Sequence, residues 1–142
     1  TITRLQNMGT PDYLISAATQ MVLAQRLARR NCKECRIPDE DVTPKVLTDL
    51  GFTPELASRA KAIKGKGCPK CKDTGYKGRQ GIYEILVVSK PIKEAILRQA
   101  TTPELREIAI KEGFQTMQDM GRRMIASGEL SFREYERVLS SE

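Results

Sequence analysis

Four cysteines in two C-x2-C pairs constrain this chain more than any other feature of its sequence. The pairs are Cys32 with Cys35 and Cys68 with Cys71, and 32 residues separate them. A C-x2-C turn can aim both sulfurs at one point, and two such turns complete the tetrahedron that Zn²⁺ prefers, with Zn–S bonds of about 2.3 Å. The chain contains no histidine, which excludes a mixed cysteine–histidine site. We therefore interpret Cys32, Cys35, Cys68 and Cys71 as the ligands of a structural zinc ion, since four protein ligands leave no position for water or substrate.

Three other uses of the four thiols stay open at this point. Four cysteines allow three disulfide connectivities, although nothing in the sequence marks the chain as secreted. A redox-active C-x2-C pair would be expected beside a thioredoxin-like βαβ pattern, which the sequence lacks. An iron–sulfur cluster uses the same four thiolates. Structural zinc is the interpretation that we favour.

The positive charge of the chain is concentrated around the cysteines. The whole chain carries a net charge of +6. Residues 61–79 contain seven Lys or Arg residues and one Asp, so this segment alone has a charge of 7 − 1 = +6. Four thiolates around Zn²⁺ leave a formal charge of −2, which these basic side chains would offset. The metal site is therefore one account of the local basicity, and a nucleic-acid partner is the competing one.

Short motifs predict where helices begin and end. Threonine is a favourable N-cap, and proline suits the first helical turn because its missing N–H would be unpaired there anyway. Helix starts are therefore expected at Thr10-Pro11, Thr43-Pro44, Thr53-Pro54 and Thr102-Pro103, and a capping box at Ser131 to Glu134 predicts a fifth. Glycine favours helix C-termini, and the candidates are Gly51, Gly65, Gly113 and Gly128.

These signals predict an α+β fold that is predominantly α-helical, with a small tetracysteine zinc subdomain followed by a helical C-terminal bundle. The segment after Pro11 is apolar on nearly all sides, which predicts a helix that is buried all round. The segment "GIYEILVVS" is rich in the β-branched and aromatic residues of strands. The expected elements are helices at 11–30, 44–50, 54–63, 90–99, 103–112, 116–127 and 132–140, and a strand at 81–89.

Several function classes are excluded for this chain taken alone. It has no apolar run near the roughly 18 residues of a membrane span and no signal-peptide pattern. It has no G-x4-G-K-[S/T] phosphate loop, and without histidine it has no Ser-His or Cys-His nucleophile. We expect no catalytic residue in this chain. Because it begins at Thr1 and not at a methionine, we also expect it to be a piece of a longer protein.

Three stretches resemble a known family. The segments "TITRLQNMG", "VLAQRLARRNCKEC" and "GCPKCKDTGYKGRQGIYEIL" are similar to the C-terminal part of the type II/type IV secretion ATPases, the PilB and GspE motors. The resemblance is distinctive from Thr1 to about Leu86, and its most specific element is the second cysteine pair with the "TGYKGR" that follows. The phrase "EILVVSKPIKEAIL" favours the pilus-extension branch.

The resemblance implies that the chain contains three segments, each belonging to a different part of the full-length protein. Residues 1–31 would be the C-terminal end of a RecA-like ATPase core, 32–79 the tetracysteine zinc-binding subdomain, and 80–142 a C-terminal strand and helical subdomain. The family's Walker motifs would lie upstream, so ATP and Mg²⁺ would bind only to the full-length protein. The phrase "QRL" at Gln25 to Leu27 matches the family, and Arg26 would face the nucleotide or a neighbouring core.

The resemblance also implies partners and a location. The full-length protein would form a homo-hexamer in the bacterial cytoplasm, at the cytoplasmic face of the inner membrane. It would dock on an inner-membrane platform protein of the PilC/GspF type and would associate with the membrane only through such partners. ATP hydrolysis would drive pilin polymerisation or type II secretion, and the zinc subdomain would transmit the motion.

Two other functions compete with this interpretation. A zinc-ribbon nucleic-acid-binding module would suit the sequence pI of about 9.3. However, the second cysteine block offers a single aromatic residue, Tyr76, where single-strand binders usually stack several bases. A chaperone cysteine-rich domain would repeat C-x-x-C-x-G-x-G, and Cys35 is followed by Arg36, Ile37 and Pro38 instead. We therefore expect no nucleic-acid partner.

Overall fold

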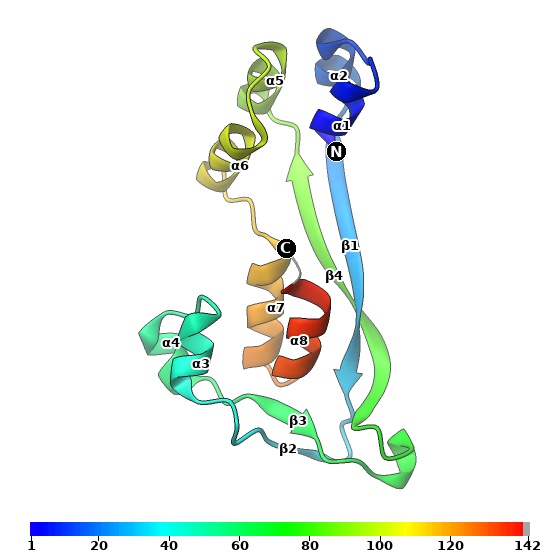
Figure 1. Ribbon diagram of the computed structural model, residues 1–142, viewed down its shortest axis with the longest axis vertical. Coiled ribbons are helices and arrows are strands. Elements are labelled where there is room, and N and C mark those ends of the chain that lie inside the picture. Colours follow the sequence, from blue (N-terminus) through cyan, green and yellow to red (C-terminus); the bar gives the residue numbers. More distant parts are fainter. Residues whose placement is uncertain (141–142) are drawn as a thin grey trace. The chain divides into compact units, whose positions relative to one another are not determined.

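The computed structural model describes residues 1–140 and has the mixed α+β fold that the sequence predicts (Figure 1). The chain divides into two compact units, which are described separately. Unit 1 contains residues 1–24 and 84–116, and unit 2 contains residues 25–83 and those from 117 onward. The long strands β1 (Met21–Asn31) and β4 (Tyr76–Val87) pair in a two-stranded sheet, and each contributes residues to both units.

Unit 1 is a small helical core. Its helices are α1 (Ile2–Asn7), α2 (Asp12–Ala18), α5 (Lys90–Leu97) and α6 (Thr102–Lys111). Helix α5 packs against both α2 and α6, and Ser16 of α2 donates a hydrogen bond to the Lys93 carbonyl at 3.2 Å. The core is aliphatic, as expected for a chain without tryptophan, and its buried members are Ile2, Ile15, Val88, Ile92, Ala95, Ile96, Leu105 and Ala109.

Unit 2 surrounds the cysteines. Strands β2 (Arg36–Pro38) and β3 (Ile63–Gly65) pair antiparallel, with Ile37 opposite Lys64. The short helices α3 (Pro44–Asp49) and α4 (Pro54–Arg59) lie between these strands in the sequence, and a 3₁₀ turn, η1 (Pro69–Cys71), follows them. Helices α7 (Met117–Ala126) and α8 (Phe132–Leu139) lie side by side (Figure 1). Gly121 permits this packing, because a Cβ there would lie 2.5 Å from Leu139 and 2.7 Å from Tyr135.

The predicted helix over residues 11–30 is wrong. Helix α2 ends at Ala18, and β1 begins at Met21. Leucine, alanine and arginine favour helices intrinsically, so local propensity was misleading here. The burial of β1 instead alternates with a period of two, as it does in a strand whose neighbour is supplied by a distant segment. Pairing with β4 therefore overrides the helical preference of this segment.

Most of the other predicted elements are confirmed, with local adjustments. Thr43 and Thr53 cap their helices through their side chains, and Gly113 and Gly128 have φ angles of +92° and +83° after helix ends. The cap of α6 is Thr101, one residue earlier than expected. The predicted helix at 54–63 ends at Arg59, so Gly65 is a strand residue and not a helix stop. None of the described helices combines the length and the apolar run needed to cross a membrane.

Glu134 forms a buried ion cluster in unit 2. Its side chain has no exposed surface, whereas those of its partners Arg29 and Arg137 are 46% and 54% exposed. Arg29 donates to the carboxylate from its backbone N–H at 3.2 Å and from its guanidinium at 2.8 and 3.0 Å. Arg137 donates through Nε at 3.0 Å. Burial raises the pKa of Glu134, but the bonds from Arg137 and Arg29 outweigh burial and lower it from 4.5 to about 2.

Replacing Glu134 by glutamine is expected to destabilise unit 2 in a pH-dependent way. At pH 7 the loss is about 2–3 kcal/mol, because charge-assisted hydrogen bonds are removed. A depressed carboxyl pKa stabilises the fold above the unfolded-state pKa, and this contribution disappears as the pH falls toward the folded-state value. The difference in free energy of unfolding between the unchanged chain and Glu134→Gln should therefore shrink as the pH falls from 4.5 to about 2.

The measurement is urea unfolding at a series of pH values. Glu136→Gln is the matched control, because Glu136 lies on the same helix and is exposed. Titrations shared by the two variants cancel in the comparison. If the difference in free energy of unfolding between Glu134→Gln and Glu136→Gln stayed constant across this pH range, the lowered pKa of Glu134 would be contradicted.

Candidate metal centre

The first cysteine pair lies where β1 leads into β2. Cys32 directly follows β1 and is fully buried, and Cys35 directly precedes β2. The backbone N–H of Cys32 donates to the Gly75 carbonyl at 2.9 Å, and the Cys35 carbonyl accepts from Lys66 at 2.9 Å. Both cysteines of the first pair are thus tied to backbone beside the second pair.

The second pair is held by a tight turn. Cys68 caps η1, and Cys71 is its last residue. The turn continues through Lys72 and Asp73 in left-handed conformations, with φ angles of 54° and 59°, and the Asp73 N–H returns to the Cys68 carbonyl at 2.9 Å. The structure thus has the local turn that the C-x2-C spacing predicts.

Backbone N–H groups point at the sulfurs. Cys71 Sγ accepts hydrogen bonds from the N–H groups of Cys68 and Gly75, each at 3.2 Å, and Cys35 Sγ accepts from Gly67 at 3.3 Å. Donors placed in this way stabilise a thiolate and not a thiol. Burial raises the pKa of Cys71, but the backbone N–H groups of Cys68 and Gly75 outweigh burial and lower it to about 6. Burial dominates at Cys35 and raises its pKa to about 11.

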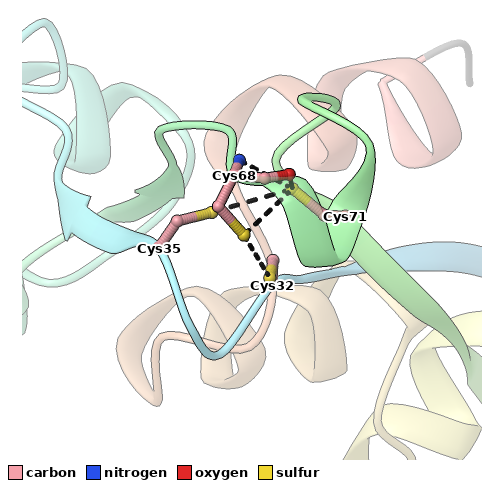
Figure 2. Close-up of side chains that lie close together, drawn as sticks. All are labelled: Cys32, Cys35, Cys68 and Cys71. Carbon is pink, nitrogen blue, oxygen red and sulfur yellow. Dashed lines mark hydrogen bonds between the residues drawn. The ribbon is translucent and has the colours of Figure 1, made fainter.

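The structure brings the four predicted sulfurs together, as Figure 2 shows. All four Sγ atoms lie within 4.8 Å of one another. The shorter separations are 3.8 Å from Cys32 to Cys68, 3.9 Å from Cys35 to Cys71 and 3.7 Å from Cys68 to Cys71. A tetrahedral ion with metal–sulfur bonds of about 2.3 Å separates its sulfurs by about 3.8 Å. The sulfur spacing therefore fits one four-coordinate ion.

The same distances bear on the other uses of the thiols. A disulfide needs an S–S distance of about 2.05 Å, and all four cysteines are free. An iron–sulfur cluster inserts several iron and sulfide atoms between its thiolates, which therefore lie farther apart than around a single ion. The geometry favours a mononuclear site with four sulfur ligands, and such a closed site holds structure together without offering a position for a substrate.

Two other residues singled out in the sequence, Arg26 and Tyr76, make contacts within unit 2. Arg26 of β1 donates a hydrogen bond from Nη1 to the Val138 carbonyl of α8 at 2.5 Å, and Gln25 is exposed. The aromatic ring of Tyr76 is covered by the Arg29 guanidinium at 4.2 Å. The sequence did not indicate the role of Glu134, because a carboxylate three residues after Ser131 is also typical of a capping box. Ser131 does accept from the Glu134 N–H at 3.1 Å, but the carboxylate binds arginines.

Comparison with known proteins identifies the family. The family model described as "Type II/IV secretion system protein" matches residues 1–137. The type IV pilus assembly ATPase PilB of Myxococcus xanthus is 36% identical over 134 residues, which cover 94% of this chain and 24% of that protein. PilB of Thermus thermophilus is 42% identical over 84% of the chain and 13% of its own length. The type II secretion system protein HxcR of Pseudomonas aeruginosa is 35% identical over 96% of the chain and 25% of its length.

The chain thus spans a quarter or less of the length of these relatives. The matches extend over nearly all of its residues, and not only over the three segments in which the sequence shows the resemblance. The predicted relationship is confirmed, and the chain belongs to the type II/IV secretion system protein family.

Proposed function

We propose that this chain is the zinc-binding, non-catalytic region of a type IV pilus assembly or type II secretion ATPase. The observation that carries the proposal is the convergence of four cysteine sulfurs within 4.8 Å, at separations that suit a tetrahedral ion. Zn²⁺ is the favoured ion because it accepts four thiolates in this geometry and has no redox chemistry of its own. Cys32, Cys35, Cys68 and Cys71 would hold the ion, which would clamp the two pairs into one rigid block.

Three segments of the chain would belong to different parts of the full-length protein. Residues 1–31 would end a RecA-like core, 32–79 would form the zinc subdomain, and 80–142 would close the protein. Uncovered apolar side chains on β1 in unit 1 support the first assignment, because they are what a strand face from a larger core would leave exposed. They are Met21 and Leu23.

The activity and assembly would belong to the full-length protein. ATP and Mg²⁺ would bind outside this chain, and the two PilB relatives are themselves called ATPases. The full-length protein would work as a homo-hexamer at the cytoplasmic face of the inner membrane, against a platform protein of the PilC/GspF type. This region would transmit ATP-driven motion of the core toward that platform, and so power pilin polymerisation or secretion.

The arrangement around Tyr76 speaks against the nucleic-acid alternative. Base stacking needs an open aromatic face. One face of the Tyr76 ring is covered by Arg29 at 4.2 Å, and its hydroxyl is bonded to Ser131 at 3.0 Å. The one aromatic residue of the second cysteine block is therefore already engaged within unit 2.

The purified 142-residue chain is expected to contain about one zinc ion per molecule, because four thiolates complete one tetrahedral site. It is expected to hydrolyse no ATP. Elemental analysis by inductively coupled plasma mass spectrometry measures the metal, and phosphate release measures the hydrolysis. Folded protein without metal would overturn the zinc assignment, and ATP turnover by the isolated chain would overturn its non-catalytic role.

A further inference from the structure

The residue next to the first zinc ligand binds the turn between α7 and α8. Asn31, which directly precedes Cys32, is 1% exposed. Its side-chain Nδ2 donates to the Gly128 carbonyl at 3.0 Å and to the Ile63 carbonyl at 3.0 Å, and its backbone N–H donates to the Glu129 carbonyl at 2.9 Å. Two of these three bonds end on the α7–α8 turn, defined here as residues 128–131.

The residues that follow the second cysteine pair bind the same α7–α8 turn. Gly75 donates its N–H to Cys71 Sγ, and the next residue, Tyr76, places its hydroxyl 3.0 Å from Ser131 Oγ. Arg29 stacks over the Tyr76 ring and is held in turn by the buried Glu134 carboxylate of α8. Each cysteine pair thus has its own anchor on the α7–α8 turn.

We propose that the metal centre controls the docking of the helix pair α7–α8, with Asn31 and Tyr76 as the positioning residues. The proposal rests on the proposed zinc site. In the sequence, 44 residues lie between the two anchors Asn31 and Tyr76. A metal bound by both cysteine pairs holds both anchors at one turn. When the metal leaves, the pairing of β1 with β4 still joins the two segments, but the turns that continue these strands into the cysteine pairs are no longer clamped, and the hydrogen bonds of Asn31 and Tyr76 to the α7–α8 turn weaken.

The coupling must act in both directions. If the bound metal stabilises the docked helices, docking stabilises the bound metal by the same factor. Helices α7 and α8 pack closely at Gly121, where the space admits no larger residue. A disturbance on α8 that reaches no cysteine directly should therefore still loosen the metal.

The first experiment follows hydrogen exchange by mass spectrometry in the zinc-loaded chain and after removal of zinc by a strong chelator. We expect peptides from α7 and α8 to lose protection together with the cysteine segments, while α5 and α6 of unit 1 keep theirs. Unchanged protection in α7 and α8 would overturn the proposal and leave the zinc site standing. Loss of protection throughout the chain would also contradict it, because the metal would then hold everything equally. A chain that takes up no zinc would overturn the zinc site itself.

The second experiment measures the rate of zinc transfer to a chromogenic chelator. Tyr76→Phe removes only the hydroxyl and is expected to speed release about fivefold, the effect of one neutral hydrogen bond. Tyr83→Phe is its control, because Tyr83 lies on the same strand and is 40% exposed. Glu134→Gln is expected to speed release about tenfold through the helix pair, since it removes charge-assisted bonds, with Glu136→Gln as control.

Circular dichroism checks that each variant is folded under the conditions of the release measurement. A merely structural role for Glu134 would lower the free energy of unfolding but leave the release rate of the folded protein unchanged. Release rates within twofold of the controls for both variants would overturn the coupling.

Discussion

Replacing Cys68 by serine is expected to abolish zinc binding and to unfold most of unit 2. Serine offers no thiolate, so three sulfur ligands remain and the tetrahedral site is open. The metal contributes about 10–16 kcal/mol of apparent binding free energy in small four-ligand sites. This is as large as the total stability of a typical domain, about 5–15 kcal/mol. Losing most of the metal-binding free energy is therefore expected to unfold the region around the site. The short elements around the cysteines, such as β2 and β3 with three residues each, have little else to hold them.

Metal content and hydrogen exchange together measure this effect. Lys70→Gln is the matched control, because Lys70 lies between Cys68 and Cys71 but is 63% exposed and makes a surface ion pair with Glu34. A surface pair of this kind is worth about 0–1 kcal/mol, so the control should keep its zinc and its fold. If Cys68→Ser lost zinc yet retained full exchange protection between β2 and β4, the metal would not be the structural clamp that we propose.

The clustering of the four cysteines was predictable because the C-x2-C spacing is a local signal. Each C-x2-C pair forms its turn from adjacent residues, and the absence of histidine limits the ligand set. Helices such as α3 and α4 were predictable for the same reason, since Thr43 and Thr53 cap them through bonds only three residues long. Where structure is decided within one turn of chain, the sequence contains the information.

The sequence-based predictions fail where contacts with distant segments determine the local structure or the role of a residue. Residues 21–31 favour a helix by propensity, but β4, more than 40 residues later, recruits them into a sheet. Glu134 looks like a capping residue until Arg29, 105 positions earlier, is placed beside it. Asn31 gives no signal at all, because an asparagine before a cysteine predicts no particular contact. These roles depend on which segments meet, and neither the pattern nor the composition of one sequence specifies that.

Gly65 is another residue whose role the sequence misassigned, and it carries the second large prediction. A Cβ at Gly65 would lie 2.0 Å from the Gly75 carbonyl oxygen and 2.6 Å from its Cα. The clash is with backbone, which cannot rotate away as a flexible side chain can. Gly75 in turn donates to Cys71 Sγ and accepts from the Cys32 N–H. Moving Gly75 therefore disturbs both cysteine pairs at once.

Gly65→Ala is accordingly expected to cost about 3 kcal/mol or more, at the upper end of what overpacking costs, and to weaken zinc binding in parallel. Gly81→Ala is the matched control: Gly81 is also a strand glycine without a positive φ, and its added Cβ would meet the hydroxyl end of Tyr83, a side chain that is 40% exposed. That side chain can move into solvent, so the control should change stability by about 0.5 kcal/mol or less. Urea unfolding and chelator competition measure the two effects. Equal losses in both variants would show that any added methyl group in a strand is harmful, and that the approach of Gly65 to Gly75 has no special part in closing the metal centre.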